Sequence, residues 1–572
     1  MCYSYKIEFS MKKSALILIA AASLFAADFA AEGKLWWSHV QFLADDNLQG
    51  RDTGSEGFHK AVEYVAGEFQ KIGLKPAGID GYLQPVKFET RQLVAAESKL
   101  ELVRDGKAEP LETADASISP RSNAGGPVEA GMVFVGYGLV VPEAHWDELA
   151  GLDLKGKIAV YVGGQAPMDV SNNVKSHYST AAERWKILEH AGAIGVATIM
   201  VPRANARGGR GGPPTEQAAG ETGGAAGSAD NANAGANAGR GGRGAGGRGP
   251  APPTFELADP ALQDNPGQQV AISITRRGFD KFFAGAGHTY DEVVKLVQDN
   301  KPLPHFPLSS SLRATVSVKR TELEAPNVVG MLPGSDSKLK HEYVIMSAHL
   351  DHLGVGRPVN GDNIYNGAMD DASGIASVIE IARLIKASGR KLKRSVIFLA
   401  VTAEEKGELG SQFFAAHPTV PADKIVADIN LDMFLPLYPL KVIEVQGLTE
   451  STLGDTVQVA ARKEGVEVQV DQEPDQNRFI RSDQYSFIKR GVPALAFKFG
   501  YEQGSPEQKI RLDWVRDRYH KPSDDLSQPV DMAAAAKFDQ VIIGLIERVA
   551  NDAARPRWKS DSFFARFAKP SI

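Results

Sequence analysis

Short apolar runs alternate with amphipathic segments through the second half of the chain. Between residues 310 and 550, strand-like runs are followed by segments with helical spacing. Strands are predicted near 343–346, 396–401 and 425–431, and a helix near 372–388. Such alternation is typical of βαβ units. We therefore expect an α/β fold with a mostly parallel central sheet flanked by helices.

The first half of the chain contains both helical spacing and strand patterns. Residues 34–73 have helical spacing and residues 84–103 have strand patterns. A denser α/β texture follows from about 125 to 200, where the helical segment "AAERWKILEH" leads into the buried run "IGVATIM". A strand is predicted at 268–275 and one helix at 278–298.

The N-terminus has the composition of an export signal. Lys12 and Lys13 precede an apolar stretch at 15–22 and then small residues, so residues 1–31 are predicted to be a signal peptide with an upstream extension. The rest of the sequence has no apolar run of about 20 residues, the length that a membrane span needs. The protein is therefore expected to be secreted or periplasmic, with no membrane span.

Residues 204–253 are rich in glycine, alanine and arginine, and large apolar residues are almost absent. Nothing there offsets the entropy of ordering, which predicts a disordered surface loop. RGG repeats occur in proteins that bind single-stranded nucleic acids. Here they are few, diluted by alanine and asparagine, and carried by an exported chain of net charge −6. We therefore expect no nucleic-acid partner.

Composition narrows the chemistry further. The chain has 572 residues, enough for two or three domains. Its single cysteine is Cys2, inside the predicted signal segment. The mature protein thus has neither disulfides nor thiolate ligands, and any metal must be held by histidine, aspartate or glutamate.

Histidines and acidic residues cluster where predicted strands end or a predicted helix begins. The clusters contain His349 and Asp351, Asp370 and Asp371, Glu404 and Glu405, and Asp432, and His520 follows much later. Ligands of open α/β sheets bind beyond the carboxyl ends of the strands, so these side chains should meet at one edge. So many acids need compensating positive charge, which a divalent metal supplies. Histidine and carboxylate donors suit zinc, with one carboxylate bridging two ions.

Two such ions would lower the pKa of a water and polarise a carbonyl group. One glutamate of the Glu404–Glu405 pair could bind metal while its neighbour accepts the proton. Each cluster alone also has an ordinary structural interpretation: two glutamates at a helix start are favoured by its dipole, and "DDASG" resembles a helix cap. Their conjunction after successive strands favours a metal site.

These motifs resemble, in order, those of the co-catalytic zinc aminopeptidases, a group that includes aminopeptidase Y, bacterial leucyl aminopeptidase and glutamate carboxypeptidase. The matching segments are "SAHLDHLG", "NGAMDDASG", "TAEEKGELGS", "NLDM" and "RYHKPSDD", and "NLQGRDTGSEG" and "RSDQYSFIKRGVPALAF" also resemble family segments. The resemblance spans nearly all of residues 34–550 and implies the zinc exopeptidase fold.

The resemblance also implies two Zn²⁺ ions and five metal ligands. These are His349, Asp370, Glu405, Asp432 and His520. In the family pattern, Asp370 bridges the ions. His349 and Asp432 hold one ion, and Glu405 and His520 hold the other.

Other positions receive roles from the same resemblance. Glu404 matches the general base, and Asp351 matches the acid that orients the imidazole of His349. His352 is expected not to be a ligand. The family often has a cis peptide bond after the bridging aspartate, here Asp370–Asp371. It commonly has asparagine where this chain has Asp371, and we expect no loss of activity from that change.

The resemblance also predicts the domain organisation. The expected parts are an N-terminal piece of the peptidase domain at 34–115, a protease-associated domain at 120–277 with the insertion 204–253, the main zinc peptidase domain at 278–555, and a C-terminal tail at 556–572.

The leading functional interpretation is an aminopeptidase that acts on peptide or protein N-termini. A carboxypeptidase or dipeptidase of the same family is the alternative, and Arg478, Arg481 or Arg511 could then bind a substrate carboxylate. A glutaminyl cyclase uses one zinc, and a catalytically dead binding protein such as the transferrin receptor should lack ligands. The complete ligand set and Glu404 argue against both. The oligomeric state and the residue preference stay open.

Overall fold

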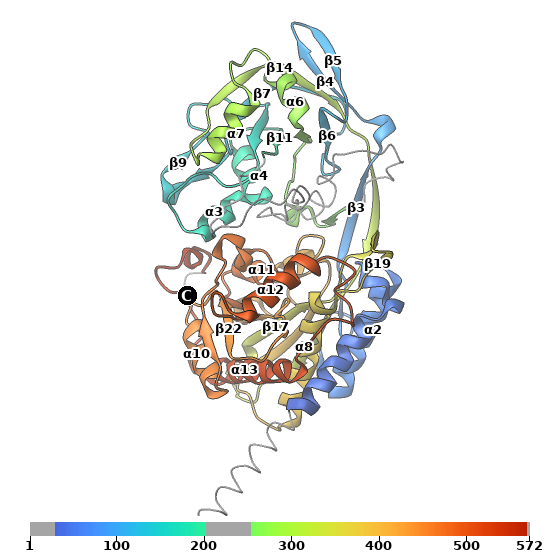
Figure 1. The fold of residues 1–572 in the computed structure, drawn as a ribbon, viewed down its shortest axis with the longest axis vertical. Coiled ribbons are helices and arrows are strands. Elements are labelled where there is room, and N and C mark those ends of the chain that lie inside the picture. Colours follow the sequence, from blue (N-terminus) through green and yellow to red (C-terminus); the bar gives the residue numbers. More distant parts are fainter. Residues whose placement is uncertain (1–28, 202–252, 569–572) are drawn as a thin grey trace, which may run out of the picture. The chain divides into compact units, whose positions relative to one another are not determined.

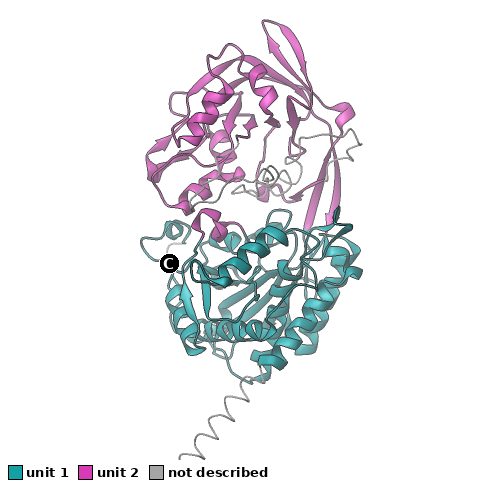
Figure 2. Ribbon diagram, viewed as in Figure 1, with its two compact units in different colours: residues 1–86, 325–472, 482–572 teal, residues 87–324, 473–481 magenta. Residues whose placement is uncertain are grey.

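The computed structural model describes residues 29–201 and 253–568. The predicted signal peptide, up to residue 28, and the glycine- and arginine-rich segment lie outside these residues. The chain divides into two compact units (Figure 2): unit 1 comprises 1–86, 325–472 and 482–572, and unit 2 comprises 87–324 and 473–481. Among the described residues, no helix combines the length and apolar character needed to cross a membrane.

Unit 1 is built on a nine-stranded mixed sheet (Figure 1). Its order is β1-β16-β20-β17-β21-β24-β22-β23, and β2 pairs with β16. The strands are β1 (Lys75–Pro76), β2 (Leu83–Gln84), β16 (Asn327–Leu332), β17 (Tyr343–His349), β20 (Ser395–Val401), β21 (Ile425–Asn430), β22 (Val442–Gln446), β23 (Glu467–Gln469) and β24 (Ala494–Phe499). The predicted α/β class is confirmed.

The strands at the centre of this sheet are parallel. Strands β20, β17, β21 and β24 are parallel neighbours, and all their residues except the first of β17 are buried. Continuous apolar runs are what strands covered on both faces require. On the flanks, β16 pairs antiparallel with β20, and β22 pairs antiparallel with β24. Apolar runs do not encode strand direction, so the sequence could not separate these edges from the centre.

Helices flank the sheet. They are the helix over residues 29–43, α2 (Glu56–Ile72), α8 (Ser373–Ala387), α9 (Leu409–Ala416), α10 (Leu453–Lys463), α11 (Gln484–Ile488), α12 (Pro506–Asp517) and α13 (Met532–Asn551). Helix α2 begins at Ser55, whose hydroxyl accepts the amide of Phe58, and ends at Gly73 in the left-handed conformation. Its buried face includes Ala61, Val65 and Phe69, as the spacing predicts.

The end of the chain is part of unit 1. Trp558 donates its indole N–H to the carbonyl of Gly491, and Phe564 is fully buried in the short helix Phe563–Phe567. Residues 556–568 are therefore packed chain. Its aromatic side chains pack against residues that are distant in sequence, so the predicted tail from residue 556 belongs to unit 1 up to residue 568.

Unit 2 contains an eight-stranded sheet, β5-β4-β14-β7-β10-β11-β13-β6, and a three-stranded sheet, β12-β3-β15. The strands are β3 (Lys87–Leu93), β4 (Lys99–Arg104), β5 (Lys107–Leu111), β6 (Ala116–Ile118), β7 (Val128–Val135), β10 (Ile158–Val162), β11 (Gly195–Ile199), β12 (Thr254–Leu257), β13 (Val270–Ile274), β14 (His305–Thr315) and β15 (Val318–Glu324). Helices α3 (Asn172–Ser179), α4 (Ala181–His190), α6 (Arg276–Phe282) and α7 (Tyr290–Gln298) also belong to it.

The borders of unit 2 differ from the predicted ones. Residues 87–115 and 278–324 were assigned to the peptidase domain, but both lie in unit 2. The cause is strand pairing, since β14 pairs with β4 and β7, and β15 pairs with β3. The single helix predicted at 278–298 is also two helices, because the link between them contains Gly285 and Gly287 at positive φ. The identity of unit 2 as a protease-associated domain stays a prediction.

Candidate metal centre

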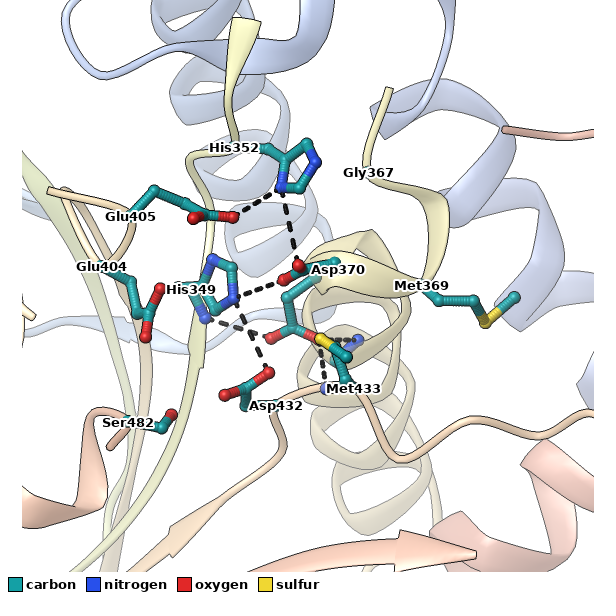
Figure 3. A network of polar contacts seen from close by, with 12 residues as sticks. His349, His352, Gly367, Met369, Asp370, Glu404, Glu405, Asp432, Met433 and Ser482 are labelled. Carbon is teal, nitrogen blue, oxygen red and sulfur yellow. Dashed lines mark hydrogen bonds and ion pairs between the residues drawn. The ribbon is translucent and has the colours of Figure 1, made fainter. Parts of the chain in front are cut away.

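Three polar clusters meet at one edge of the central sheet because their strands are neighbours. His349 is the last residue of β17, Glu404 lies just beyond β20, and Asp432 lies just beyond β21. Strands β20 and β21 flank β17 and run parallel to it. The carboxyl ends of these strands therefore place the three side chains together, as Figure 3 shows.

Asp370 arrives from the turn before α8. The peptide bond between Asp370 and Asp371 is cis, as the resemblance predicts. The Asp524 carboxylate accepts the backbone N–H groups of Met369 and Asp370 at 3.0 and 3.1 Å. These bonds fix the turn, so the Asp370 side chain points to the space beside His349 (Figure 3).

The first donor group consists of His349, Asp370 and Asp432. His349 Nε2 lies 3.1 Å from Asp370 Oδ1 and 3.8 Å from Asp432 Oδ1. One ligand atom from each residue lies within 4.8 Å of the others, an arrangement that could hold a metal ion. His349 and Asp370 are buried and Asp432 is half-buried.

The second donor group shares Asp370 with the first. His520 Nε2 lies 3.3 Å from Asp370 Oδ2 and 3.3 Å from Glu405 Oε2. His352, which was predicted not to be a ligand, also lies here. Its ligand atom is within 4.8 Å of those of Asp370 and Glu405. The structure thus brings all five predicted ligands together and adds a third histidine.

The electrostatics of the centre suit a cation. Asp370 Oδ2 and Glu405 Oε1 are buried and have no hydrogen-bond partner among the described residues. Although burial opposes it, His349 and His520 hold the pKa of Asp370 well below its ordinary value. Glu405 and Asp370 raise the pKa of His520 to about 10, also against the effect of burial. Buried carboxylate oxygens that lack hydrogen-bond partners are suitable ligands for a divalent ion.

Glu404 has a different environment. It belongs to neither donor group and is half-buried beside His349 (Figure 3). Withdrawal from solvent raises its pKa well above the ordinary value, and the neighbouring Glu405 and Asp432 act in the same direction, while His349 opposes them. A carboxylate with a raised pKa can accept and return a proton near neutral pH.

The Asp351 carboxylate holds the glutamate loop. It accepts the backbone N–H of Glu404 at 3.0 Å, that of Glu405 at 3.3 Å and the Thr53 hydroxyl at 3.0 Å. The prediction that this carboxylate orients His349 is wrong about the atom. His349 Nδ1 lies 3.0 Å from the main-chain oxygen of Asp351, because the carboxylate is already occupied by three donors.

Asp371 is a second buried brace. Its carboxylate accepts the backbone N–H groups of His349, Gly374 and Met433 at 3.2, 3.0 and 3.2 Å. His349 is a member of the first donor group, and Met433 directly follows Asp432, another member of that group. The three donors accommodate an aspartate where the family commonly has asparagine.

The segment 51–53 links these braces, and no role was predicted for it. Arg51 is fully buried and donates to the carbonyls of Leu350 at 2.9 Å, Asn366 at 2.7 Å and Leu43. It therefore ties the loop after His349 to the turn before Asp370. The motif "NLQGRDTGSEG" was the available clue, since a buried arginine needs several fixed acceptors.

The three arginines that could have bound a substrate carboxylate have other contacts or lie in unit 2. Arg511 is buried and donates to both carboxylate oxygens of Glu444 at 3.1 Å. Arg478 donates to Glu473 at 2.8 Å, and both Arg478 and Arg481 belong to unit 2. Arg511 is thus committed to the core of unit 1.

Comparison with known proteins covers the region that carries the centre. Residues 327–546 match the profile of peptidase family M28. A probable leucine aminopeptidase 2 of Aspergillus oryzae is 29% identical over 199 residues, 34% of this chain and 37% of its own length. A probable zinc metalloprotease of Pyrenophora teres is 35% identical over 106 residues, 18% of this chain and 22% of its own length.

Carboxypeptidase Q of Bos taurus is also similar, with 35% identity over 112 residues, 19% of this chain and 21% of its own length. The matches thus cover less than two fifths of each of these relatives.

Proposed function

We propose that this chain, which carries a peptidase family M28 domain over residues 327–546, is a zinc-dependent aminopeptidase with a two-ion centre. One observation carries the proposal. Two donor groups share Asp370, while Glu404 stands beside them and belongs to neither. A shared carboxylate suits two adjacent ions, and a carboxylate left outside the ligand set suits a general base.

Each ligand set would comprise the residues already predicted. His349, Asp370 and Asp432 would hold one zinc, and Asp370, Glu405 and His520 the other. Histidine and carboxylate donors without cysteine are a usual zinc environment. When bound, the ions would supply positive charge that acidifies a water molecule and polarises the peptide carbonyl.

Glu404 would perform the proton transfers. Its half-buried carboxylate accepts the proton of the attacking water and later delivers it to the leaving amine. The N–H groups of Glu404 and Glu405 are held by Asp351, so base and ligand keep a fixed relation to each other. Asp371 and Asp524 keep His349 and Asp370 in place by the same kind of contact.

An amine terminus suits the charge of this site better than a carboxylate terminus does. Buried acids outside the two donor groups include Asp351, Asp371 and Asp483. Such surroundings favour a substrate ammonium group and oppose a carboxylate. The name of the fungal relative, leucine aminopeptidase, supports the same choice. The bovine relative, carboxypeptidase Q, makes carboxypeptidase activity the second candidate.

A rate assay tests the proposal. The protein is given a panel of aminoacyl-anilides, the same compounds with blocked amines, and N-blocked peptides with free carboxylates. We expect turnover of free-amine substrates only, lost after chelation and restored by zinc. Turnover confined to free-carboxylate substrates would replace the aminopeptidase with the carboxypeptidase. Full turnover after complete removal of metal would reject the metal mechanism.

We also propose that the protein acts outside the cytoplasm. The support is the pattern of Lys12 and Lys13 followed by the apolar stretch 15–22. N-terminal sequencing of the protein from cell fractions tests this. Export predicts a secreted or periplasmic form that begins near residues 26–31, and an uncleaved cytoplasmic form would contradict it.

A further inference from the structure

His352 is the histidine of the centre that the predicted ligand set does not use. Its side chain is completely buried. Nδ1 lies 2.7 Å from Glu405 Oε1 and 3.9 Å from Asp370 Oδ2. Figure 3 shows dashed lines from this ring to both carboxylates, so His352 faces the second donor group.

Polar atoms around this ring are short of partners. Both nitrogens of His352, Asp370 Oδ2 and Glu405 Oε1 are buried and form no hydrogen bond among the described residues. A buried polar atom without a hydrogen-bond partner destabilises the folded protein. Several of them at one place are costly together, unless a group that the protein binds satisfies them.

The approach of His352 to Glu405 indicates what that group is. Nδ1 and Oε1 are 2.7 Å apart, close enough for a hydrogen bond, yet both count among the atoms without one. The ligand atoms of His352, Asp370 and Glu405 all lie within 4.8 Å of one another, an arrangement that could hold a common cation.

The surrounding chain fixes the ring in this place. The amide of His352 donates to the carbonyl of Arg51 at 3.2 Å. A Cβ at Gly367 would lie 2.6 Å from two carbon atoms of the ring, so glycine leaves the room that the imidazole occupies. The rings of His352 and His520 lie edge to face with centroids 5.9 Å apart. Both imidazoles are thus held around Asp370 and Glu405.

We propose that His352 Nδ1 is a fourth protein ligand of the second metal position, with Asp370, Glu405 and His520. This inference rests on the proposed zinc centre and adds a ligand to it. It makes the two positions unequal. Catalytic zinc sites typically have three protein ligands and one open place, whereas sites with four protein ligands are closed. The open place would then belong to the His349 position, next to Glu404.

X-ray absorption at the zinc edge of the intact, zinc-loaded protein tests the ligand count without any mutation. If His349, His352 and His520 all bind, three imidazoles over two ions give about 1.5 per zinc. Without His352 the value is about 1.0, and this inference fails while the proposed function stands. A protein that binds no zinc at all contradicts both.

Variants separate a ligand from a hydrogen-bond donor. Zinc affinity is measured by competition with a chelator for the wild type, His352→Ala, His352→Asn and the control His59→Ala, an exposed histidine of α2. Partners outside the ligand set usually contribute 10–100-fold in affinity. For a ligand, we expect one zinc to be weakened by about 100-fold or more in both His352 variants, with the other zinc and the control unchanged.

The asparagine variant is the discriminating one. Its amide can still donate to Glu405 but is a poor zinc ligand. Wild-type affinity of both zinc ions in His352→Asn would show that the residue only orients Glu405, and would overturn the inference. Circular dichroism of the metal-free proteins checks folding. If a variant does not fold, the absorption measurement on the wild type decides.

Discussion

The two donor groups share one carboxylate and differ in almost everything else. The group of His349 and Asp432 stands at the ends of two sheet strands and has Glu404 beside it. The group of Glu405 and His520 contains a further buried histidine, His352. In the proposed two-ion centre, the first position would keep room for reaction beside the base, and the second would anchor charge.

Removing the shared carboxylate should have the largest effect, because both donor groups contain it. Asp370→Ala takes one ligand from each group and leaves His349 and His520 without the carboxylate that they share. We expect the loss of both tightly bound zinc ions and turnover at background. Metal analysis after dialysis checks this, and two retained zinc ions would show that Asp370 is not the bridge.

Replacing the base should leave both positions filled. Glu404→Gln keeps the size of the side chain but cannot accept the proton, so turnover should fall by about 10²–10⁴-fold. Zinc content should match the wild type, because Glu404 lies outside both groups. Glu404→Asp is the matched acidic control. Wild-type turnover in Glu404→Gln would remove Glu404 from the mechanism.

A change one contact further out should weaken zinc at the second position more than at the first. Thr53→Val removes the hydroxyl that bonds Asp351, whose carboxylate holds the N–H of Glu405. We expect about a tenfold weaker zinc at the second position, the low end of what such outer contacts contribute. Thr53→Ser should restore the affinity. Equal weakening at both positions would mean that the brace does not distinguish them.

A core mutation elsewhere in unit 1 should leave the zinc affinities of both donor groups unchanged. Phe564 is fully buried near the end of the chain. Phe564→Ala should lower the free energy of unfolding by about 3–5 kcal/mol, as cavities left by large aromatic residues do. Urea unfolding measures this. Zinc affinities should be unchanged, and a large change there would couple the centre to the C-terminal packing.

The clustering of the candidate ligands could be predicted because strand ends and motif order carry that information. His349, Glu404 and Asp432 follow apolar runs that became adjacent parallel strands. Local pattern does not reveal which backbone groups a side chain meets. Asp351 was thus given the wrong contact atom for His349, and the contacts of Arg51 with Leu350 and Asn366 stayed hidden because they join residues about 300 positions apart. His352 was set aside because the family pattern has no role for it.

The domain borders failed for a related reason. Residues 87–115 and 278–324 have ordinary strand and helix patterns, and only their long-range pairing assigns them to unit 2. The order of apolar runs predicts which elements exist. It does not predict which sheet a strand joins, because the strand's partners are distant in sequence.

The most direct test of the central claim is a stepwise zinc titration of the metal-free protein, with bound zinc and turnover of a free-amine anilide followed together. A two-ion centre predicts saturation at two zinc ions per chain. The first zinc should fill the four-donor position with little turnover, and activity should rise with the second, beside Glu404. Full turnover at one zinc per chain, or saturation at one, would contradict it.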